Sequence, residues 1–165
     1  PCEDDHARVA PMIPSLDELI LEQAKALQEL AASLADIPGG RDLIDWFEGM
    51  PEFGDAEIVS LLLERQGRSA LRIALDRNGK SAIVLFELSA WIDTNLLGFS
   101  QQNVVSGLKL RRAGEREIQV WERGVGCQPG DWLIELGPCF GAYGTIRAGI
   151  TRIVIERAPD RADDW

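Results

Sequence analysis

Carboxylates crowd the stretch between residues 41 and 58, and they are the first candidates for chemistry. Two carboxylates that face each other across a pocket can share general acid–base work. Carboxylates that stay on the surface instead attract a basic protein and speed its association. The sequence brings no two of them to one pocket, so an acidic surface is the interpretation we favour. Its candidate partner-binding residues are Asp42, Asp45, Glu48, Glu52 and Asp55.

Histidine and cysteine chemistry has little support. The only histidine is His6, which leaves no second imidazole for a metal site and no well-placed base for a Ser-His or Cys-His pair. Three cysteines, Cys2, Cys127 and Cys139, are too few and too scattered for a secreted disulfide framework. Nothing near them in the sequence would activate a thiol, so we interpret them as small apolar residues. We expect no catalytic residue and no metal ligand.

Cofactor motifs are missing as well. The chain has no P-loop, no dinucleotide fingerprint and no EF-hand spacing. Two glycine-rich stretches, 124–126 and 137–144, do not lie between a strand and a helix, where backbone N–H groups would cradle a phosphate. We interpret both as turns and expect no cofactor.

Two helices are predicted before any strand. Ser15 and Glu18 have the spacing of a capping box, in which each side chain satisfies a free backbone N–H of the first turn. The helix that follows ends at the Pro-Gly-Gly of 38–40, and a shorter one covers 41–48. The first helix carries an apolar stripe, predicted to face the core, of Leu16, Leu19, Ile20, Leu27, Leu30 and Leu34.

The rest of the chain reads as a series of short strands. Alternating apolar residues and turn residues predict strands at 57–65, 70–76, 82–91, 104–110, 117–122 and 132–136, and a final pair within 145–156. The Asn-Gly at 78–79 predicts a tight hairpin, whereas 93–103 breaks the alternation. Helices that precede every strand cannot be crossovers, so the strands should be antiparallel. The predicted fold class is α+β: an antiparallel sheet of about seven to eight strands, a meander or sandwich, with two N-terminal helices packed on it. The sequence does not decide whether the strands close into a barrel.

Length and composition bound the possible functions. We expect one domain over residues 15–159, with a flexible tail at 1–14 and a polar tail at 160–165. The net charge of −10 repels a phosphate backbone, so nucleic acid is not an expected partner. No apolar run approaches the length of about 20 residues that a membrane helix needs, and no leader opens the chain, so we expect a cytoplasmic protein without a membrane partner. The oligomeric state does not follow from the sequence.

Two short motifs stand out by their order. Phe-Gly-Asp-Ala-Glu begins at Phe53, after Trp-Phe at 46–47 and Met-Pro at 50–51, and Gly-Phe-Ser-Gln-Gln-Asn-Val begins at Gly98. Tyr-Gly at 143–144 and a closing Ile-Val-Ile-Glu-Arg-Ala-Pro at 153–159 follow. This order resembles the immunity protein 50 family of bacterial polymorphic toxin systems, over residues 46–159. The family-motif residues are Phe53, Asp55, Ala56, Glu57, Gly98, Phe99, Gln102 and Asn103.

The resemblance implies a non-catalytic cytoplasmic protein that binds and neutralises a cognate toxin, and the acidic surface suits a basic one. Gly54 stands where the family has histidine, and Ser100 where it has asparagine, so roles of those side chains are absent here. The alternative is a small-molecule-binding β protein, or an enzyme using paired carboxylates, with a pocket in the sheet. A third possibility is an interaction module of a larger complex. A deep pocket lined by Asp or Glu with Trp would favour the alternative, and a flat acidic face would favour the immunity protein.

Overall fold

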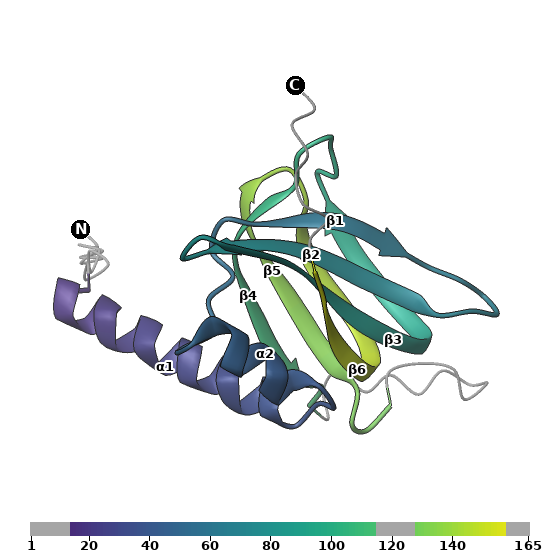
Figure 1. Ribbon diagram of the computed structural model, residues 1–165, viewed down its shortest axis with the longest axis horizontal. Helices are drawn as coiled ribbons and strands as arrows, with labels where there is room; N and C mark the ends of the chain where they lie inside the picture. Colours follow the sequence, from purple (N-terminus) through teal and green to yellow (C-terminus); the bar gives the residue numbers. More distant parts are fainter. Residues whose placement is uncertain (1–13, 115–127, 158–165) are drawn as a thin grey trace, which may run out of the picture.

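Two helices precede six strands in the described residues. The computed structural model describes residues 14–114 and 128–157 (Figure 1). These residues confirm the predicted α+β class, with an antiparallel sheet and N-terminal helices packed on it. The predicted strand at 117–122 and the two tails, Pro14 apart, lie outside the described residues. The elements are α1 (Leu16–Ala35), α2 (Gly40–Phe47), β1 (Ala56–Leu62), β2 (Ser69–Arg77), β3 (Lys80–Leu97), β4 (Val104–Arg112), β5 (Trp132–Phe140) and β6 (Tyr143–Arg157).

The sheet closes into a barrel in the order β1-β2-β3-β6-β5-β4, with every neighbouring pair antiparallel. The structure therefore decides the point that the sequence left open. The closing pair, β1 with β4, is short: only Ala56 with Val105 and Glu57 with Val104 are in register. Beyond these residues no strand of the described chain pairs with that edge of β4.

The long strands β3 and β6 bend instead of ending. Their pairing shifts register between Leu88 and Ile92, where the N–H of Gly149 donates a hydrogen bond to Ser89 Oγ at 3.0 Å. A bulge of this kind kinks a strand without terminating it. Two sequence expectations are therefore wrong: the break expected at 93–103 begins only after Leu97, and the final pair within 145–156 is one bent strand.

The predicted hairpin and strand faces agree with the structure. Arg77 pairs with Lys80 across the turn, and Asn78 and Gly79 both have positive φ, 53° and 73°. This is the conformation that a two-residue hairpin loop requires. The alternating apolar residues of β2 all point into the barrel core: Leu71, Ile73 and Leu75.

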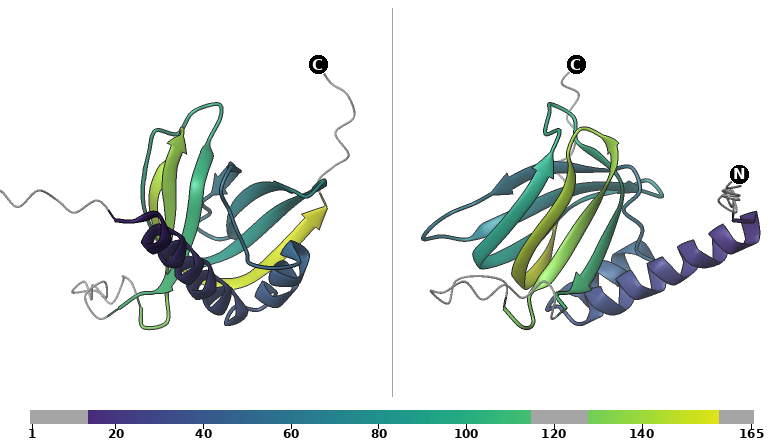
Figure 2. Two further views of the ribbon diagram at one scale, coloured as in Figure 1. Left: turned by 90° about the vertical axis from the view of Figure 1, so that its left-hand side faces the viewer. Right: turned by 180° about the vertical axis from the view of Figure 1, so that it is seen from behind.

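Helix α1 follows the sequence prediction over only half its length. Both helices lie at the same end of the barrel, at the bottom of each view (Figure 2). Leu30 and Leu34 are buried in the common core, but Leu16, Leu19 and Ile20 are 72%, 47% and 56% exposed. The first half of α1 projects past the barrel (Figure 1), so the apolar stripe continues beyond the surface that it covers. Neither helix of the described chain is long and apolar enough to cross a membrane.

The predicted capping box opens α1. Ser15 N–H donates to Glu18 Oε2 at 2.7 Å, and Glu18 N–H donates to Ser15 Oγ at 3.3 Å. These bonds from Ser15 hold the pKa of the Glu18 carboxyl below its usual value. Because the folded pKa is depressed, this contribution to helix stability is present at neutral pH and fades only as the pH falls through the lowered pKa.

The turn between α1 and α2 is fitted closely against β6. Ile153 N–H donates to the carbonyl of Pro38 at 2.8 Å, and Gly39 has a φ of 81°. A Cβ on Gly39 would lie 2.0 Å from the carbonyl oxygen of Ile153, which is backbone and cannot swing away. Glycine is therefore required where the helix pair docks on the barrel.

We predict that Gly39→Ala lowers the free energy of unfolding by about 2 kcal/mol or more, because it adds a backbone clash to a left-handed conformation. Urea denaturation followed by circular dichroism measures the change. Gly49→Ala is the matched control, since a Cβ there meets no atom within 4 Å and φ is not positive. Equal stability of the two variants would contradict the tight docking of this turn.

Candidate functional site

The five candidate partner-binding carboxylates are all exposed, on α2 and on the connection to β1. Two of them have basic neighbours. Glu48 forms an ion pair with Lys80, and Glu52 lies 3.9 Å from Arg77. Arg77 also donates to the carbonyl of Gly54, which ties the connection to β2. Exposed pairs of this kind contribute little to stability and can open for a partner.

The other three carboxylates are free among the described residues. Asp42 and Asp45 lie on α2, and Asp55 precedes β1; none of the three side chains forms an ion pair or a hydrogen bond with another described residue. Asp55 serves the fold through its backbone, whose N–H donates to the carbonyl of Val105 at 2.9 Å beside the barrel closure. All three carboxylates are thus available to a basic partner.

The first family motif is mostly structural. Phe53 is 1% exposed, and its ring lies 5.6 Å from that of Phe47 and 6.5 Å from that of Phe86. Ala56 is buried, and the half-buried Glu57 pairs with both β2 and β4. This motif anchors the start of β1 in the core, and Asp55 is its exposed carboxylate.

The second family motif builds the loop between β3 and β4 around Asn103. The Asn103 side chain is 4% exposed; its Oδ1 accepts from the N–H groups of Ser100 at 2.8 Å and Ala142 at 3.2 Å. Its Nδ2 donates to the carbonyl of Ser100 at 2.8 Å, and its own carbonyl accepts from Ile58 N–H at 2.8 Å. One residue therefore joins this loop, the β5–β6 hairpin and β1.

The neighbours of Asn103 divide between structure and surface. Gly98 has a φ of 71°, and a Cβ there would lie 2.8 Å from the carbonyl oxygen of Gly141. Ser100 donates through its hydroxyl to the carbonyl of Gln102 at 2.6 Å. The side chains of Phe99 and Gln102 are exposed. Exposed side chains of this motif can meet a partner, whereas Asn103 is buried.

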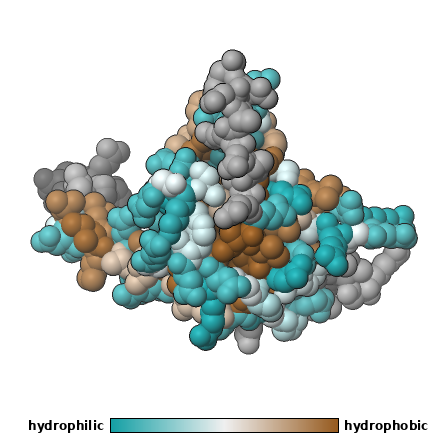
Figure 3. All heavy atoms as spheres, in the orientation of Figure 1, coloured by the Kyte–Doolittle hydropathy of each residue, from teal (hydrophilic) through white to brown (hydrophobic). Residues whose placement is uncertain are grey.

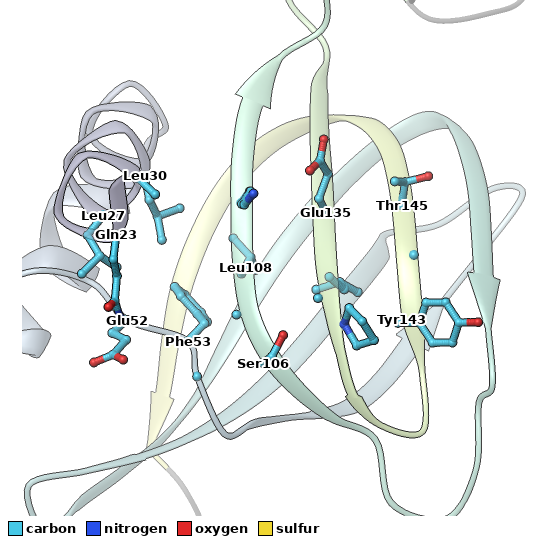
Figure 4. Close-up of a pocket in the computed structure, with 18 residues that line it drawn as sticks. Gln23, Leu27, Leu30, Glu52, Phe53, Ser106, Leu108, Glu135, Tyr143 and Thr145 are labelled. Carbon is cyan, nitrogen blue, oxygen red and sulfur yellow. The ribbon is translucent and has the colours of Figure 1, made fainter. Parts of the chain in front are cut away.

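A pocket of about 470 Å³ lies between α1 and the barrel (Figure 4). Leu27 and Leu30 of α1 line it on one side, and Phe53 and Leu108 line it between α1 and the barrel. On the barrel, the paired residues Lys109, Glu135 and Thr145 form a row across β4, β5 and β6. Gly107 and Gly137 also line the pocket, and an added Cβ on Gly107 would meet nothing within 4 Å. The lack of side chains on these two glycines thus contributes to the volume of the pocket.

The charges of this pocket are mixed. Glu52 and Glu135 line it, but each lies near an arginine: Glu52 near Arg77, and Glu135 at 3.5 Å from Arg111. A second hollow of about 300 Å³ shares Lys109, Glu135 and Leu30 with it and continues along α1. Among the described residues no tryptophan lines the pocket, so these residues show only part of the pattern that would favour a carboxylate enzyme. The sequence did not reveal the pocket, because its walls come from five separate segments.

Histidine, cysteine and carboxylate side chains form no metal site among the described residues. Among residues 14–114 and 128–157, no three His, Cys, Asp or Glu side chains are placed to hold a metal ion. Cys139, which we interpreted as a small apolar residue, is a free, exposed thiol; His6, Cys2 and Cys127 lie outside the described residues.

No protein-family model, curated protein or solved structure matches this chain. The resemblance of its motifs to the immunity protein 50 family therefore stays a prediction. What the described residues do provide is a set of exposed carboxylates on α2 and the connection to β1, and a separate hollow between α1 and the barrel.

We predict that Asn103→Asp lowers the free energy of unfolding by about 2–3 kcal/mol, because a carboxylate oxygen would face the Ser100 carbonyl in place of the donating amide. Chemical denaturation measures the loss. Gln102→Glu makes the same amide-to-acid change one residue earlier on an exposed side chain, and it should stay within about 0.5 kcal/mol. A loss of the same size in both variants would contradict the structural role of Asn103.

Proposed function

We propose that this protein binds a basic protein toxin and neutralises it by stoichiometric contact in the cytoplasm, without catalysis. One observation carries the proposal. Residues 41–57 hold six carboxylates and one arginine, a local net charge of −5. Of these six, Asp42, Asp45 and Asp55 are exposed and have no basic partner among the described residues.

An acidic surface of this kind suits a toxin that itself acts on a polyanion. A nuclease must present cations to phosphates, and the same cations are attracted by a carboxylate cluster. Electrostatic attraction mainly speeds the encounter, which matters for a protein that must capture a toxin before it acts. The chain's net charge of −10 adds a long-range field of the same sign.

We expect this chain, when it is coexpressed with a toxin encoded beside its own gene, to restore growth of the host and to copurify with the toxin in a one-to-one complex. Viable counts and size-exclusion chromatography with light scattering measure the two results. A toxin from an unrelated gene pair serves as the control. Full toxicity in the presence of folded protein would refute the proposal.

We expect the combined variant Asp42→Lys, Asp45→Lys and Asp55→Lys to slow association with that toxin more than about tenfold at low salt, since attraction becomes repulsion. Stopped-flow mixing measures the rate. For a matched single change, Asp45→Lys should slow association more than Glu64→Lys, which reverses an exposed charge in the β1–β2 turn. Unchanged rates in the triple variant would move the interface to another face.

The pocket between α1 and the barrel favours a second candidate function, the binding of a small molecule. Its volume of about 470 Å³ falls within the usual range for such sites, and apolar side chains are accompanied by a few polar groups. Gly107→Leu should place a side chain in the hollow, because a Cβ at this position meets no atom within 4 Å. Native mass spectrometry would then find a copurified ligand on the original protein and none on this variant. A ligand-free original protein would count against this function.

A further inference from the structure

The apolar stripe of α1 is buried in one half of the helix and exposed in the other. Its second half is buried, with Leu30 and Leu34 in the barrel core. Its first half continues the same spacing with Leu16, Leu19 and Ile20, all exposed. Figure 3 shows this first half as a hydrophobic surface at the free end of the helix. From Leu16 to Leu27 the stripe runs for about 16 Å at the helical rise per residue.

The exposed stripe leads into the pocket. Gln23 and Leu27 follow Leu16 and Ile20 on the same face of α1, and both line the pocket beside Phe53 (Figure 4). The smaller hollow runs on along α1 past Glu22 and Ala26. The exposed stripe therefore ends beside a pocket of about 470 Å³, which is room for a large side chain. A partner helix can lay one face along such an apolar stripe and insert one anchor side chain into the pocket.

Charge indicates what fits the groove. Between residues 15 and 24, α1 carries Asp17, Glu18 and Glu22 and no lysine or arginine. At the pocket the charges are mixed, because Lys109 lies beside the ion pair of Glu135 with Arg111. The exposed half of α1 is thus an apolar stripe with acidic flanks. A second copy of the chain would bring the same flanks and another net charge of −10, so self-association is disfavoured.

We infer that the exposed half of α1 and the adjoining pocket form a docking groove for an amphipathic helix of the partner, with an apolar face and lysine or arginine on its flanks. The helical spacing of the stripe matches a helix laid along it, and one large apolar side chain of the partner enters the pocket beside Leu27. The groove is a contact site for the partner. This inference rests on the proposed function only in taking that partner to be the basic toxin.

Synthetic peptides test the groove without the toxin. A labelled peptide of about 18 residues carries leucine at three- and four-residue spacings with lysine flanks, and its control has glutamate in place of every lysine. Fluorescence anisotropy with the full chain should show at least about tenfold tighter binding of the lysine peptide. Equal affinity for the two peptides, or binding of neither, would overturn the inference.

Substitutions locate the binding. Leu19→Glu with Ile20→Glu makes α1 more acidic, so simple charge attraction would strengthen binding of the lysine peptide, whereas loss of the apolar stripe should weaken it at least about tenfold. Gly107→Leu should also weaken it by filling the pocket. Val59→Glu changes an exposed apolar residue of β1 and should leave the affinity within about twofold. Unchanged binding to the Leu19→Glu, Ile20→Glu variant would overturn the inference.

Two other occupants are distinguished by separate measurements. Sedimentation velocity should show a monomer; a dimer that disappears in the Leu19→Glu, Ile20→Glu variant would assign the groove to a second copy and overturn the inference. Neutral phosphatidylcholine vesicles should not retain the protein in a flotation assay; retention through the same residues would assign it to a lipid surface with the same consequence.

The toxin, once paired with this chain, separates the two proposals. If the toxin binds the original protein and the Leu19→Glu, Ile20→Glu variant equally well, the groove is wrong and the toxin-binding function stands. If the toxin does not bind the original protein but the lysine peptide does, the groove stands for another basic partner and the proposed function fails. If the toxin binds the original protein and the variant loses at least about tenfold in affinity, both hold.

Discussion

Closure of the barrel between β1 and β4 is the constraint on which the other parts depend. The two strands meet over only two residue pairs, so the junction needs support from outside the ladder. Asn103 supplies it, because its carbonyl holds Ile58 and its buried amide holds the turn at Ser100 and the hairpin at Ala142. Phe53 seals the junction from within the core. The hydrogen bonds of this buried side chain stabilise one another, so the loops at this end of the barrel are linked.

The helices complete what the strands leave open. Because no described strand pairs with the rest of that edge of β4, α1 packs against it and contributes Leu30 and Leu34 to the core. The helix is longer than the surface it has to cover, and its first half stays exposed. The pocket lies where α1 and the barrel do not pack completely against each other, and Gly107 and Gly137 line it. The proposed groove is thus a direct consequence of how the barrel is closed.

Charge and hydrophobicity are separated on this molecule in a way that suits protein recognition. Three free carboxylates on α2 and the connection to β1 provide long-range attraction, while the exposed apolar stripe of α1 provides area that gains energy only on contact. Both belong to the α1, α2 and 48–55 segment that precedes the barrel. In the proposed complex, the carboxylates would speed encounter and the apolar stripe would slow dissociation. A partner that is basic and apolar in one helix would use both.

Local chemistry made several features predictable from the sequence alone: the Ser15–Glu18 capping box, the Asn-Gly hairpin at 78–79, the inward face of β2 and the α+β class. These depend on neighbours in the chain, or on a period of two or 3.6 residues. Tertiary structure alone decided the rest. The bends of β3 and β6 come from a bulge across two strands, and barrel closure comes from residues about 50 positions apart in sequence. The extent of α1 burial was likewise not in its pattern, because periodicity shows which face is apolar but not how much of that face another element covers.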